Sequence, residues 1–541
     1  MDRRSVLVGA ALPLVGSLFG CEKLEEIQGG FTGIDHARGH LLRERKAWPA
    51  PTQIHKTRFV IAGGGVAGLA AARALRLKNQ QDFVLLELEN QAGGNSRGGG
   101  VNGIACPLGA HYLPVPGDAA VDVQNLLEEL GLRKRVAGRW VYDERHLCHS
   151  PQERLFFNGE WQEGLLPLHG VGRETLTQYQ RFAALVAQAR QSGVWSVPAS
   201  RGSPSPFMES LAAVTFERYL AQHGLTDPHL RWYLDYCCND DYGAGAATVS
   251  AWAGLHYFAS RHGFSAPRLE AADTIEHADR EGVLTWPEGN GWLTRQLALP
   301  LKERLHTGWL VVRIAAGKHG VEVDALNSAT QTVERWQAER CIVALPVFVA
   351  ARVVENPPEF LRQAAARTRY APWLVANIHI KTSLQDRPGA PPSWDNVIHD
   401  AATPHAHGAS LGYVDAMHQS LQSVPGATVL THYRALGDVP QGRKLLMDKP
   451  WTEWRDVILA DLSRAHPDIA AKAARIDITR YGHAMAIPMP GGSLQSGLAA
   501  AGRLSFAHSD WAGYSVFEEA FTLGHAAGLS AASVASAQPP L

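Results

Sequence analysis

The sequence predicts an α/β protein with a Rossmann-type unit, because an apolar strand, a glycine-rich turn, a helix and a second strand follow one another directly. Residues 58–62 form the strand candidate, and the alanine-rich residues 69–75 form the helix candidate. Gly63, Gly65 and Gly68 stand between them, at the spacing that permits a tight turn, a close approach to a pyrophosphate and close helix packing. The helix N-terminus offers free N–H groups and a positive dipole end to phosphates. We therefore expect a dinucleotide on this turn.

The second strand candidate, residues 83–88, carries the acidic residue that such a unit uses to bind a ribose. Glu87 lies 19 residues after Gly68, where a dinucleotide fold places the carboxylate that accepts from the ribose hydroxyls. Glu89 is the alternative, and a solvated charge at a strand end is the other interpretation. An acidic group here also disfavours a 2′-phosphate, so we do not expect NADP.

A second glycine cluster favours a flavin over a nicotinamide cofactor. Gly93 and Gly94 are followed by Asn95, Ser96 and Arg97, and then by three more glycines. Glycines at these positions let the backbone run close to the pyrophosphate and the isoalloxazine. The cofactor that this pattern predicts is FAD.

Composition adds only exclusions. The chain has 541 residues, of which 45% are hydrophobic and 19% are charged, as in ordinary soluble proteins of more than one domain. The formal net charge of -1 gives no reason to expect a nucleic-acid partner. The cysteines have neither the spacing of a disulfide framework nor that of a zinc site, so we expect no metal, and we interpret Cys237 and Cys238 as free buried thiols.

The N-terminus has the pattern of an export signal. Arg3 and Arg4 precede an apolar run over residues 6–19 that is too short to span a bilayer. The paired arginines indicate the twin-arginine route, and Gly20-Cys21 resembles a bacterial lipoprotein processing site. We expect an exported, periplasmic protein whose membrane contact is limited to a lipid on Cys21. A frayed apolar terminus with a chance cysteine is the alternative.

These motifs together resemble the flavin-containing amine oxidases, the family that includes monoamine and polyamine oxidases. The resemblance extends along the chain through residues 58–112, 286–293, 311–314, 320–323, 341–346, 502–507, 511–514 and 518–520. It implies a discontinuous FAD-binding domain (57–140, 280–350 and 475–541) with an inserted α+β substrate domain (141–279 and 351–474), preceded by an export signal (1–21) and a tether (22–56).

The resemblance also implies a set of site residues. Those expected at the cofactor are Gly63, Gly65, Val66, Ala67, Gly68, Glu87, Gly93, Gly94, Asn95, Ser96, Arg97, Val311, Tyr514 and Glu519. Tyr514 matches the tyrosine of the family's aromatic cage, although two extra residues separate it from the last helix, and a packed core tyrosine is the alternative. The second cage position falls on Ala484 or His483, so no second aromatic residue is expected there.

Arg352 occupies the place where the family carries a lysine that holds a water at flavin N5. A permanently charged, planar guanidinium would replace a compact amine, so flavin reduction should survive while reoxidation by oxygen slows. A surface arginine displaced by one or two positions is the alternative.

Asp240 and Asp241 follow an aromatic-rich segment and are candidates for binding a cationic amine, although we favour a solvated turn before Gly243. The resemblance implies hydride transfer from an amine C–H to flavin N5, with an amine or polyamine as substrate and oxygen or another electron acceptor. The alternatives are a desaturase or isomerase that acts on an apolar substrate, and a flavin-binding protein with little turnover. Peroxide release with amines distinguishes the first class.

Replacing Arg3 and Arg4 with lysine should trap a precursor in the cytoplasm, because the twin-arginine route requires the arginine pair. Cys21→Ala should leave an exported but unlipidated protein. Cell fractionation and acyl labelling measure the two outcomes. Normal export of the double-lysine variant would exclude the twin-arginine route.

Overall fold

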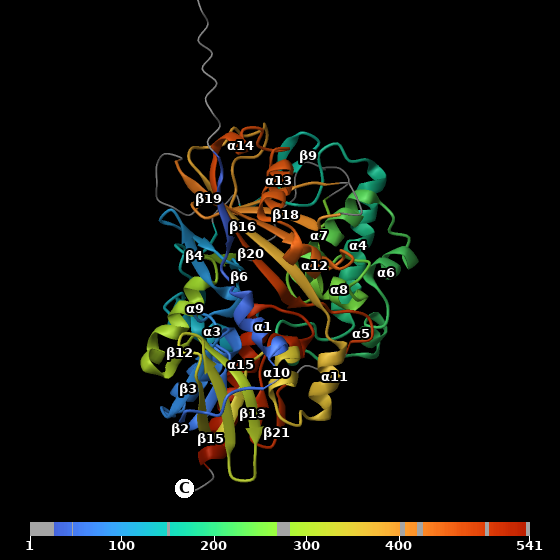
Figure 1. The fold of residues 1–541 in the computed structure, drawn as a ribbon. Helices are drawn as coiled ribbons and strands as arrows, with labels where there is room; N and C mark the ends of the chain where they lie inside the picture. Colours follow the sequence, from blue (N-terminus) through green and yellow to red (C-terminus); the bar gives the residue numbers. More distant parts are fainter. Residues whose placement is uncertain are drawn as a thin grey trace, which may run out of the picture.

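The computed structural model describes residues 26–45, 47–148, 152–267, 282–400, 406–418, 426–492 and 497–536. These residues build two large sheets, one in each half of the molecule, with helices around them (Figure 1). Arg3, Arg4 and Cys21 lie outside the described residues, so the export signal stays a prediction.

The sheet at the bottom of Figure 1, which we call the Rossmann sheet, contains the predicted strand–turn–helix unit. Its strands run in the order β12 (Leu305–Thr307), β3 (Phe83–Glu87), β2 (Gln53–Ala62), β15 (Val333–Val343), β14 (Val321–Asn327) and β13 (Trp309–Ala316). The first four are parallel, and the last three form an antiparallel meander. β22 (Leu504–Phe506) adds a parallel pairing to the end of β15, and β21 (Ala499–Ala501) pairs with β22. The predicted α/β class is confirmed.

Helix α2 (Val66–Leu77) packs on this sheet beside the last helix, α15 (Phe517–Ser536), which also contacts the sheet. Two glycines allow the helices to touch. A Cβ on Gly524 would lie 2.0 Å from the Ala67 carbonyl oxygen, and one on Gly528 would lie 2.5 Å from the Ala71 oxygen. Since α2 is buried from Val66 to Leu75, this contact fixes the position of its N-terminus. The remaining helices of this half are α3 (Val121–Glu129), α9 (Gly291–Ala298), α10 (Val347–Val353) and α11 (Glu359–Arg367).

The second sheet, which we call the upper sheet, is mixed. Its strands run in the order β1 (Gln28–Thr32), β20 (Ala473–Ala486), β16 (Tyr370–Ile380), β19 (Thr428–Ala435), β18 (Ala409–Asp415), β17 (Asp395–Ile398), β9 (Glu153–Phe157) and β10 (Glu160–Glu163). Alternate residues of β16 face opposite cores, as the strand period requires. Trp373 and Val375 belong to one core, and Leu374 and Ala376 belong to the other.

Helices cover both faces of the upper sheet. The core that contains Trp373 is completed by α4 (Arg173–Gln191), α5 (Pro206–Leu211), α6 (Phe216–Gln222), α7 (Pro228–Tyr242) and α8 (Ala251–Ala259). The opposite core is completed by α12 (Gly442–Asp448), α13 (Trp451–Leu462) and α14 (Ile469–Lys472).

The N-terminal segment is more than a tether. Residues 28–45, which we call the N-terminal strap, comprise β1 and helix α1 (His36–Glu44). β1 pairs in parallel with β20 over its whole length. Its Gly29 has a φ of +142°, and a Cβ there would lie 1.9 Å from the Ile476 oxygen. The glycines that allow this close pairing lower the strand propensity of the segment, which explains why its sequence indicates no strand.

Two expected domain boundaries also differ from the packing. β20 lies in the upper sheet, although residues 475–486 were assigned to the FAD-binding domain. α10 and α11 pack on the Rossmann sheet through Val347, Val353 and Leu361, although residues 351–367 were assigned to the substrate domain. In each case an apolar face decides the location, and the sequence does not indicate which of two sheets that face will cover.

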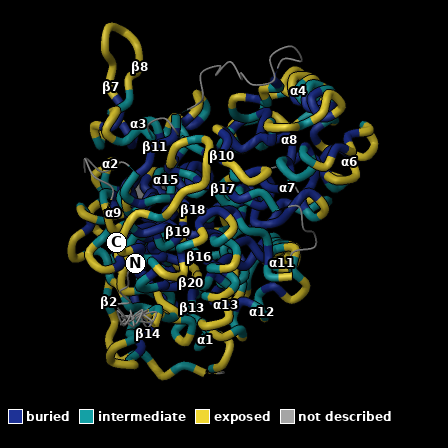
Figure 2. The backbone as a smooth tube through the Cα atoms, turned by 90° about the horizontal axis from the view of Figure 1, so that it is seen from above, coloured by how far each residue is buried: buried dark blue, intermediate teal, exposed yellow. Residues whose placement is uncertain are grey.

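Small two-stranded sheets complete the described chain. They are β4 (Gly98–Val101) with β5 (Ile104–Pro107), β6 (Tyr112–Pro114) with β11 (Val283–Thr285), and β7 (Arg133–Val136) with β8 (Arg139–Tyr142). The β7–β8 hairpin is exposed and projects from the body, whereas the buried chain runs through the two sheets (Figure 2). Among the described residues, none of the helices has the length and apolar character needed to cross a bilayer.

Gly524→Ala should destabilise the protein by about 1–3 kcal/mol through steric overlap with α2, even though alanine favours a helix over glycine by about 1 kcal/mol. Thermal and denaturant unfolding measure the change. Ser533→Ala, on an exposed position of the same helix, is the matched control and should change stability by less than about 0.5 kcal/mol. A stabilised Gly524→Ala protein would contradict the close contact.

Candidate functional site

A cavity of about 800 Å³ runs between the two sheets. Its walls come from the start of α2, the end of β3, the N-terminal strap and the segment that leads into α15. Of the residues predicted from the sequence, it is lined by Gly63, Gly65, Val66, Ala67, Glu87, Gly93, Gly94, Asn95, Ser96, Val311 and Arg352. Gly68, Arg97, Tyr514 and Glu519 do not line it.

Two glycine turns form the floor of this cavity. Gly65 caps α2, and an added Cβ there would meet only the Gly94 Cα, at 4.0 Å, so the turn presents open backbone to the cavity. The two turns are joined by a hydrogen bond of 2.8 Å from the Gly93 N–H to the Gly64 oxygen. The first N–H groups of α2 have no acceptor within the helix. This cradle suits a diphosphate.

Gly63 and Gly68 are required for packing. Gly63 has a φ of +104°, and a Cβ there would lie 2.3 Å from the Ala344 oxygen. A Cβ on Gly68 would lie 1.9 Å from the Gly63 oxygen. Gly68 therefore keeps its predicted role in holding the helix against the strand, and it acts from behind the cavity wall.

Glu87 ends β3 at the cavity wall with a buried carboxylate. This carboxylate accepts hydrogen bonds of 2.8 Å from the Gly64 N–H and of 2.8 Å from the Glu89 N–H. Burial raises the pKa of Glu87 above its usual value, against the two N–H donors. Glu89 also lines the cavity, and it lies 3.7 Å from the Arg97 guanidinium. Glu87 is thus fixed in orientation as a ribose acceptor would need to be.

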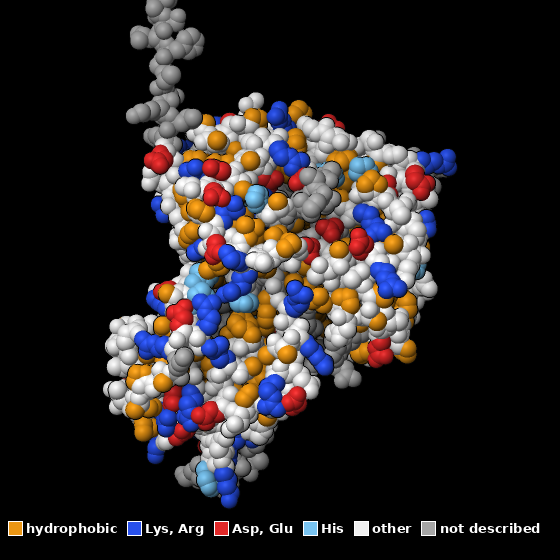
Figure 3. Space-filling view, turned by 45° about the vertical axis from the view of Figure 1, so that its right-hand side comes forward, with side chains coloured by type: hydrophobic (Ala, Val, Ile, Leu, Met, Phe, Trp, Pro, Cys, Tyr) orange, Lys and Arg blue, Asp and Glu red, His pale blue; other side chains and the backbone are white. Residues whose placement is uncertain are grey.

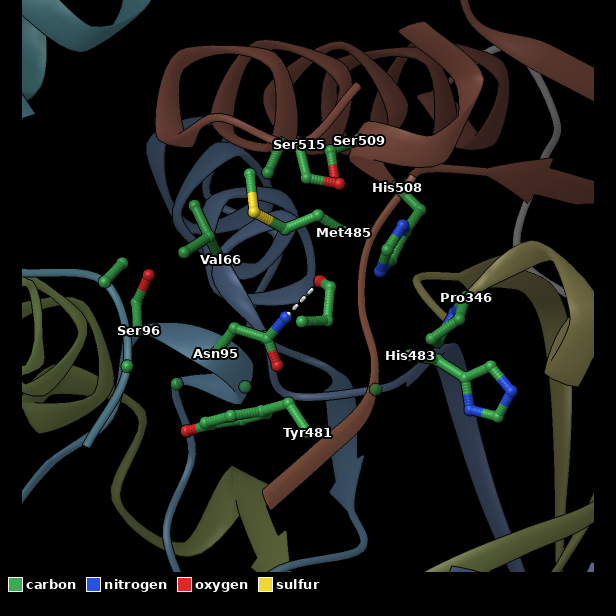
Figure 4. A pocket seen from close by; sticks show the side chains of 18 of the residues that line it. Val66, Asn95, Ser96, Pro346, Tyr481, His483, Met485, His508, Ser509 and Ser515 are labelled. Atoms are coloured by element: carbon green, nitrogen blue, oxygen red, sulfur yellow. Dashed lines mark hydrogen bonds between the residues drawn. The ribbon is translucent and has the colours of Figure 1, made fainter. Parts of the chain in front are cut away.

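Asn95 reaches across the cavity, whereas Arg97 turns away from it. The Asn95 Nδ2 donates to the Ala484 oxygen at 2.6 Å, as the dashed line in Figure 4 shows. Ser96 offers its carbonyl to the Thr294 hydroxyl at 2.9 Å. Arg97 is buried and donates at 2.9 Å to the carbonyl of Gly33 in the strap. The structure places Arg97 as a support for the strap and not as a residue of the cavity wall.

Tyr514 and Glu519 pair with each other outside the cavity. The Tyr514 hydroxyl donates to Glu519 at 2.5 Å, and the buried ring packs against Trp252 and His256. Glu519 also accepts from the Ala199 N–H. The packed-tyrosine alternative is correct, because the two extra residues before α15 rotate Tyr514 into the core and bring Val516 to the cavity instead.

The other expected cage position falls on Ala484 or His483, and both residues line the cavity. Ala484 and Met485 line the cavity there. The His483 ring lies further along the wall, 4.5 Å from the Phe348 ring and 5.6 Å from the Tyr370 ring. On the facing segment, Val516 and Phe517 line the cavity.

Arg352 is exposed on α10, at the rim of the cavity. Its Nε donates at 2.6 Å to the Leu42 oxygen, and an Nη lies 3.4 Å from the Arg43 oxygen. These carbonyls end α1, where a cation is stabilising. The structure therefore gives Arg352 a support role at the strap. The residues that line the cavity from the next strand, β16, are Tyr370, Trp373 and Val375.

Aromatic rings surround the inner end of the cavity, which we call the chamber. The sequence indicated only some of its residues. The His111 ring lies 4.4 Å from the Tyr433 ring and 5.0 Å from the Tyr112 ring. The Tyr433 hydroxyl donates to the Gly109 oxygen at 2.9 Å, which fixes the turn that carries His111. Burial lowers the pKa of His111 to about 3, so this imidazole is neutral.

Asp240 and Asp241 form part of this chamber, in the last turn of α7, so the interpretation as a solvated turn is wrong. Asp241 is buried and lies 3.0 Å from the Arg261 guanidinium. Asp240 lines the chamber, with the Tyr112 hydroxyl 3.4 Å from its Oδ2, and no salt bridge to it occurs among the described residues. Burial, followed by the charge of Asp241, raises the pKa of Asp240 to about 7.

Other cavity residues gave little signal in the sequence. His36 and His40 of α1, Arg443 of α12, and Asp510 line it. The Asp510 carboxylate accepts from the Tyr370 hydroxyl at 2.6 Å and from the Val347 N–H at 2.9 Å, so it ties both sheets to the cavity. In the described part of the chain, no group of three or more His, Cys, Asp or Glu side chains is placed to hold a metal ion.

Comparisons with known proteins agree with this architecture. Wild-type putrescine oxidase bound to putrescine superposes with a TM-score of 0.64 at 17% identity, over 89% of this chain and 100% of that chain. Cyclohexylamine oxidase from Brevibacterium oxydans IH-35A superposes with a TM-score of 0.62 at 17% identity, over 89% and 99%. A conjugated-linoleic-acid (CLA)-producing fatty acid isomerase from P. acnes gives 0.57 at 15% identity, over 87% and 97%.

These similarities show the fold: an α/β architecture with a flavin domain and a substrate domain. A search of curated proteins finds no match. The model of the flavin containing amine oxidoreductases matches residues 66–528, most of the chain and both sheets. The protein is therefore a member of the flavin-containing amine oxidoreductase family.

Proposed function

We propose that the protein is an FAD-dependent oxidoreductase that oxidises an amine by hydride transfer from the carbon beside the nitrogen. One observation carries this proposal: a groove suited to a dinucleotide runs without interruption into a chamber that contains a carboxylate with no cation partner among the described residues. Aromatic and aliphatic side chains enclose the chamber. The enclosed carboxylate favours a substrate with a positive charge.

The groove residues fit FAD. The open backbone at Gly65 and Gly94 and the N–H groups of α2 suit the diphosphate, and Glu87 suits the ribose hydroxyls. Val311 is placed for the adenine end, because it lines the same wall as Glu87. When bound, the flavin would supply the hydride acceptor. We expect non-covalent binding, with the flavin released into the supernatant on acid precipitation.

Asp240 is the group that we propose for the substrate ammonium. Hydride transfer requires a free amine, so the ammonium proton has to leave first. Asp240 can accept it, because its raised pKa lies close to neutrality, and the Tyr112 hydroxyl orients the carboxylate. The neutral His111 beside it does not repel a cation. Arg261 is neutralised by its pair with Asp241.

A second candidate is a desaturase- or isomerase-type reaction on an apolar substrate. Ala484 and Val516 support it, because the aromatic cage residues of an amine site are replaced by aliphatic ones. Anaerobic titration with a panel of amines and of unsaturated fatty acids separates the candidates. Bleaching of the flavin by amines alone supports amine oxidation, whereas isomerisation of a fatty acid without net bleaching supports the second candidate.

We also propose that the protein is exported through the twin-arginine route and anchored by a lipid on Cys21. That route carries folded proteins, so the cofactor can be loaded before export. The sequence of residues 1–21 supports this proposal.

Glu87→Gln should weaken FAD binding by about 1.5–3 kcal/mol, because a charge-assisted acceptor for the ribose is lost. The quenching of flavin fluorescence on titration of the apoprotein measures the dissociation constant. Glu89→Gln, which changes the neighbouring carboxylate, is the matched comparison and should have a smaller effect. If the two variants exchanged their effects, the ribose acceptor would be Glu89.

Asp240→Asn should lower kcat/KM about 100-fold, since a positioned base is lost. In the wild type, kcat/KM should fall as the pH is lowered through about 7, where Asp240 takes up a proton. The Asp240→Asn variant should lack this acid limb, the fall of kcat/KM at low pH. Asp235→Asn is the matched control: its carboxylate is on the same helix with a pKa raised to about 6, but it does not line the cavity. Retention of the limb in Asp240→Asn would remove Asp240 from the reaction.

A further inference from the structure

We propose that the N-terminal strap is a wall of the dinucleotide site, and that the cofactor leaves only when helix α1 lifts away. This inference rests on the proposed FAD cofactor. It assigns a binding role to residues 28–45, which precede the first Rossmann strand and lie outside the part of the chain that the family model matches. The groups that contact the cofactor would include His36 and His40 of α1 together with Arg443 of α12.

The position of α1 is the first argument. It lies at the waist of the molecule, between the two sheets (Figure 1). His36, Gly39 and His40 line the same cavity as Glu87 and Val311, which we assign to the adenosine end. No residue of α1 is fully buried. A helix that contributes no buried residue to a core, yet lines a cavity along its length, has its role at that cavity.

The first half of the strap is held in place without α1, which is the second argument. β1 is an edge strand of the upper sheet, and the Arg480 guanidinium stacks 3.6 Å from the Phe31 ring. At the turn between β1 and α1, Arg97 donates to the Gly33 oxygen. These contacts fix the first half of the strap independently of α1.

The contacts that hold α1 to the Rossmann half are fewer than those that hold β1 to the upper sheet. Arg38 donates to the Asn90 side chain at 2.8 Å, and Arg352 donates to the Leu42 oxygen at 2.6 Å. Leu42 packs against the apolar cluster that includes Leu310. Because both hydrogen bonds are exposed, α1 is the part of the strap that opens most easily.

Charge is the third argument. Figure 3 shows histidine side chains and Lys or Arg side chains gathered where the molecule narrows. Arg443 lines the cavity with an Nη 3.5 Å from the His40 Nε2, and no acidic group of the described residues lies within salt-bridge distance of it. Burial and then Arg480 lower the pKa of His36 to about 4, so Arg443 carries the positive charge. A cation without a salt-bridge partner among the described residues, on the wall of the same cavity, complements the negative charge of a diphosphate.

The release of FAD from the holoenzyme tests the proposal. Arg352→Ala removes the contact at the end of α1, and Arg362→Ala is the matched control, an exposed arginine on the neighbouring helix α11 that binds Glu359 and not the strap. The holoenzyme is diluted into an excess of a protein that binds free flavin and so prevents rebinding. The change in flavin fluorescence then gives the rate of release. We expect release about tenfold faster for Arg352→Ala, as loss of one charge-assisted hydrogen bond gives, and an unchanged rate for Arg362→Ala.

Trypsin cleavage after Arg38 or Arg43, identified by mass spectrometry, reports whether α1 has lifted. If Arg352→Ala leaves cleavage unchanged, Leu42→Asp with Arg352→Ala removes the apolar contact as well. Faster cleavage with release at the wild-type rate, in either variant, would overturn the proposal. Faster cleavage together with faster release supports it. A wild-type protein that binds no FAD would instead remove the proposed function itself.

Discussion

The contact between the backbones of β2, α2 and α15 is the constraint on which the rest of the site depends. Gly68 lets α2 approach the Gly63 carbonyl, and Gly524 lets α15 approach the Ala67 carbonyl. A side chain at either position would displace the start of α2, and with it the N–H groups at the glycine turn. These N–H groups can bind a phosphate only at hydrogen-bond distance. Binding of the cofactor therefore depends on the close packing of α2.

Two arginines that the sequence predicts at the flavin, Arg97 as a cofactor-binding residue and Arg352 as a catalytic one, hold the strap instead. Arg97 binds the carbonyl of Gly33, and Arg352 binds the carbonyl of Leu42. Each guanidinium satisfies a backbone oxygen that would otherwise lack a partner within regular structure. The strap therefore connects the two halves: β1 pairs with the upper sheet over its whole length, and Arg97 and Arg352 hold the following residues to the Rossmann half.

The glycine turns, Glu87 and the long apolar strands could be predicted from the sequence, because each depends on local spacing. The strap could not, since Gly29 and Gly30 reduce strand propensity and only the long-range pairing with β20 stabilises β1. The prediction that Tyr514 faces the cavity does not hold, for a related reason. Its neighbours fit the family pattern, but a two-residue difference before α15 rotates the side chain to the opposite face, and a sequence motif does not specify that rotation.

The chamber shows how burial separates the roles of its ionisable groups. The same loss of water that lowers the pKa of His111 to about 3 raises the pKa of Asp240 to about 7. The charge of Arg261 is compensated by Asp241, whose carboxylate lies 3.0 Å away. The chamber thus keeps one group that changes its protonation near neutral pH, and that group faces the cavity.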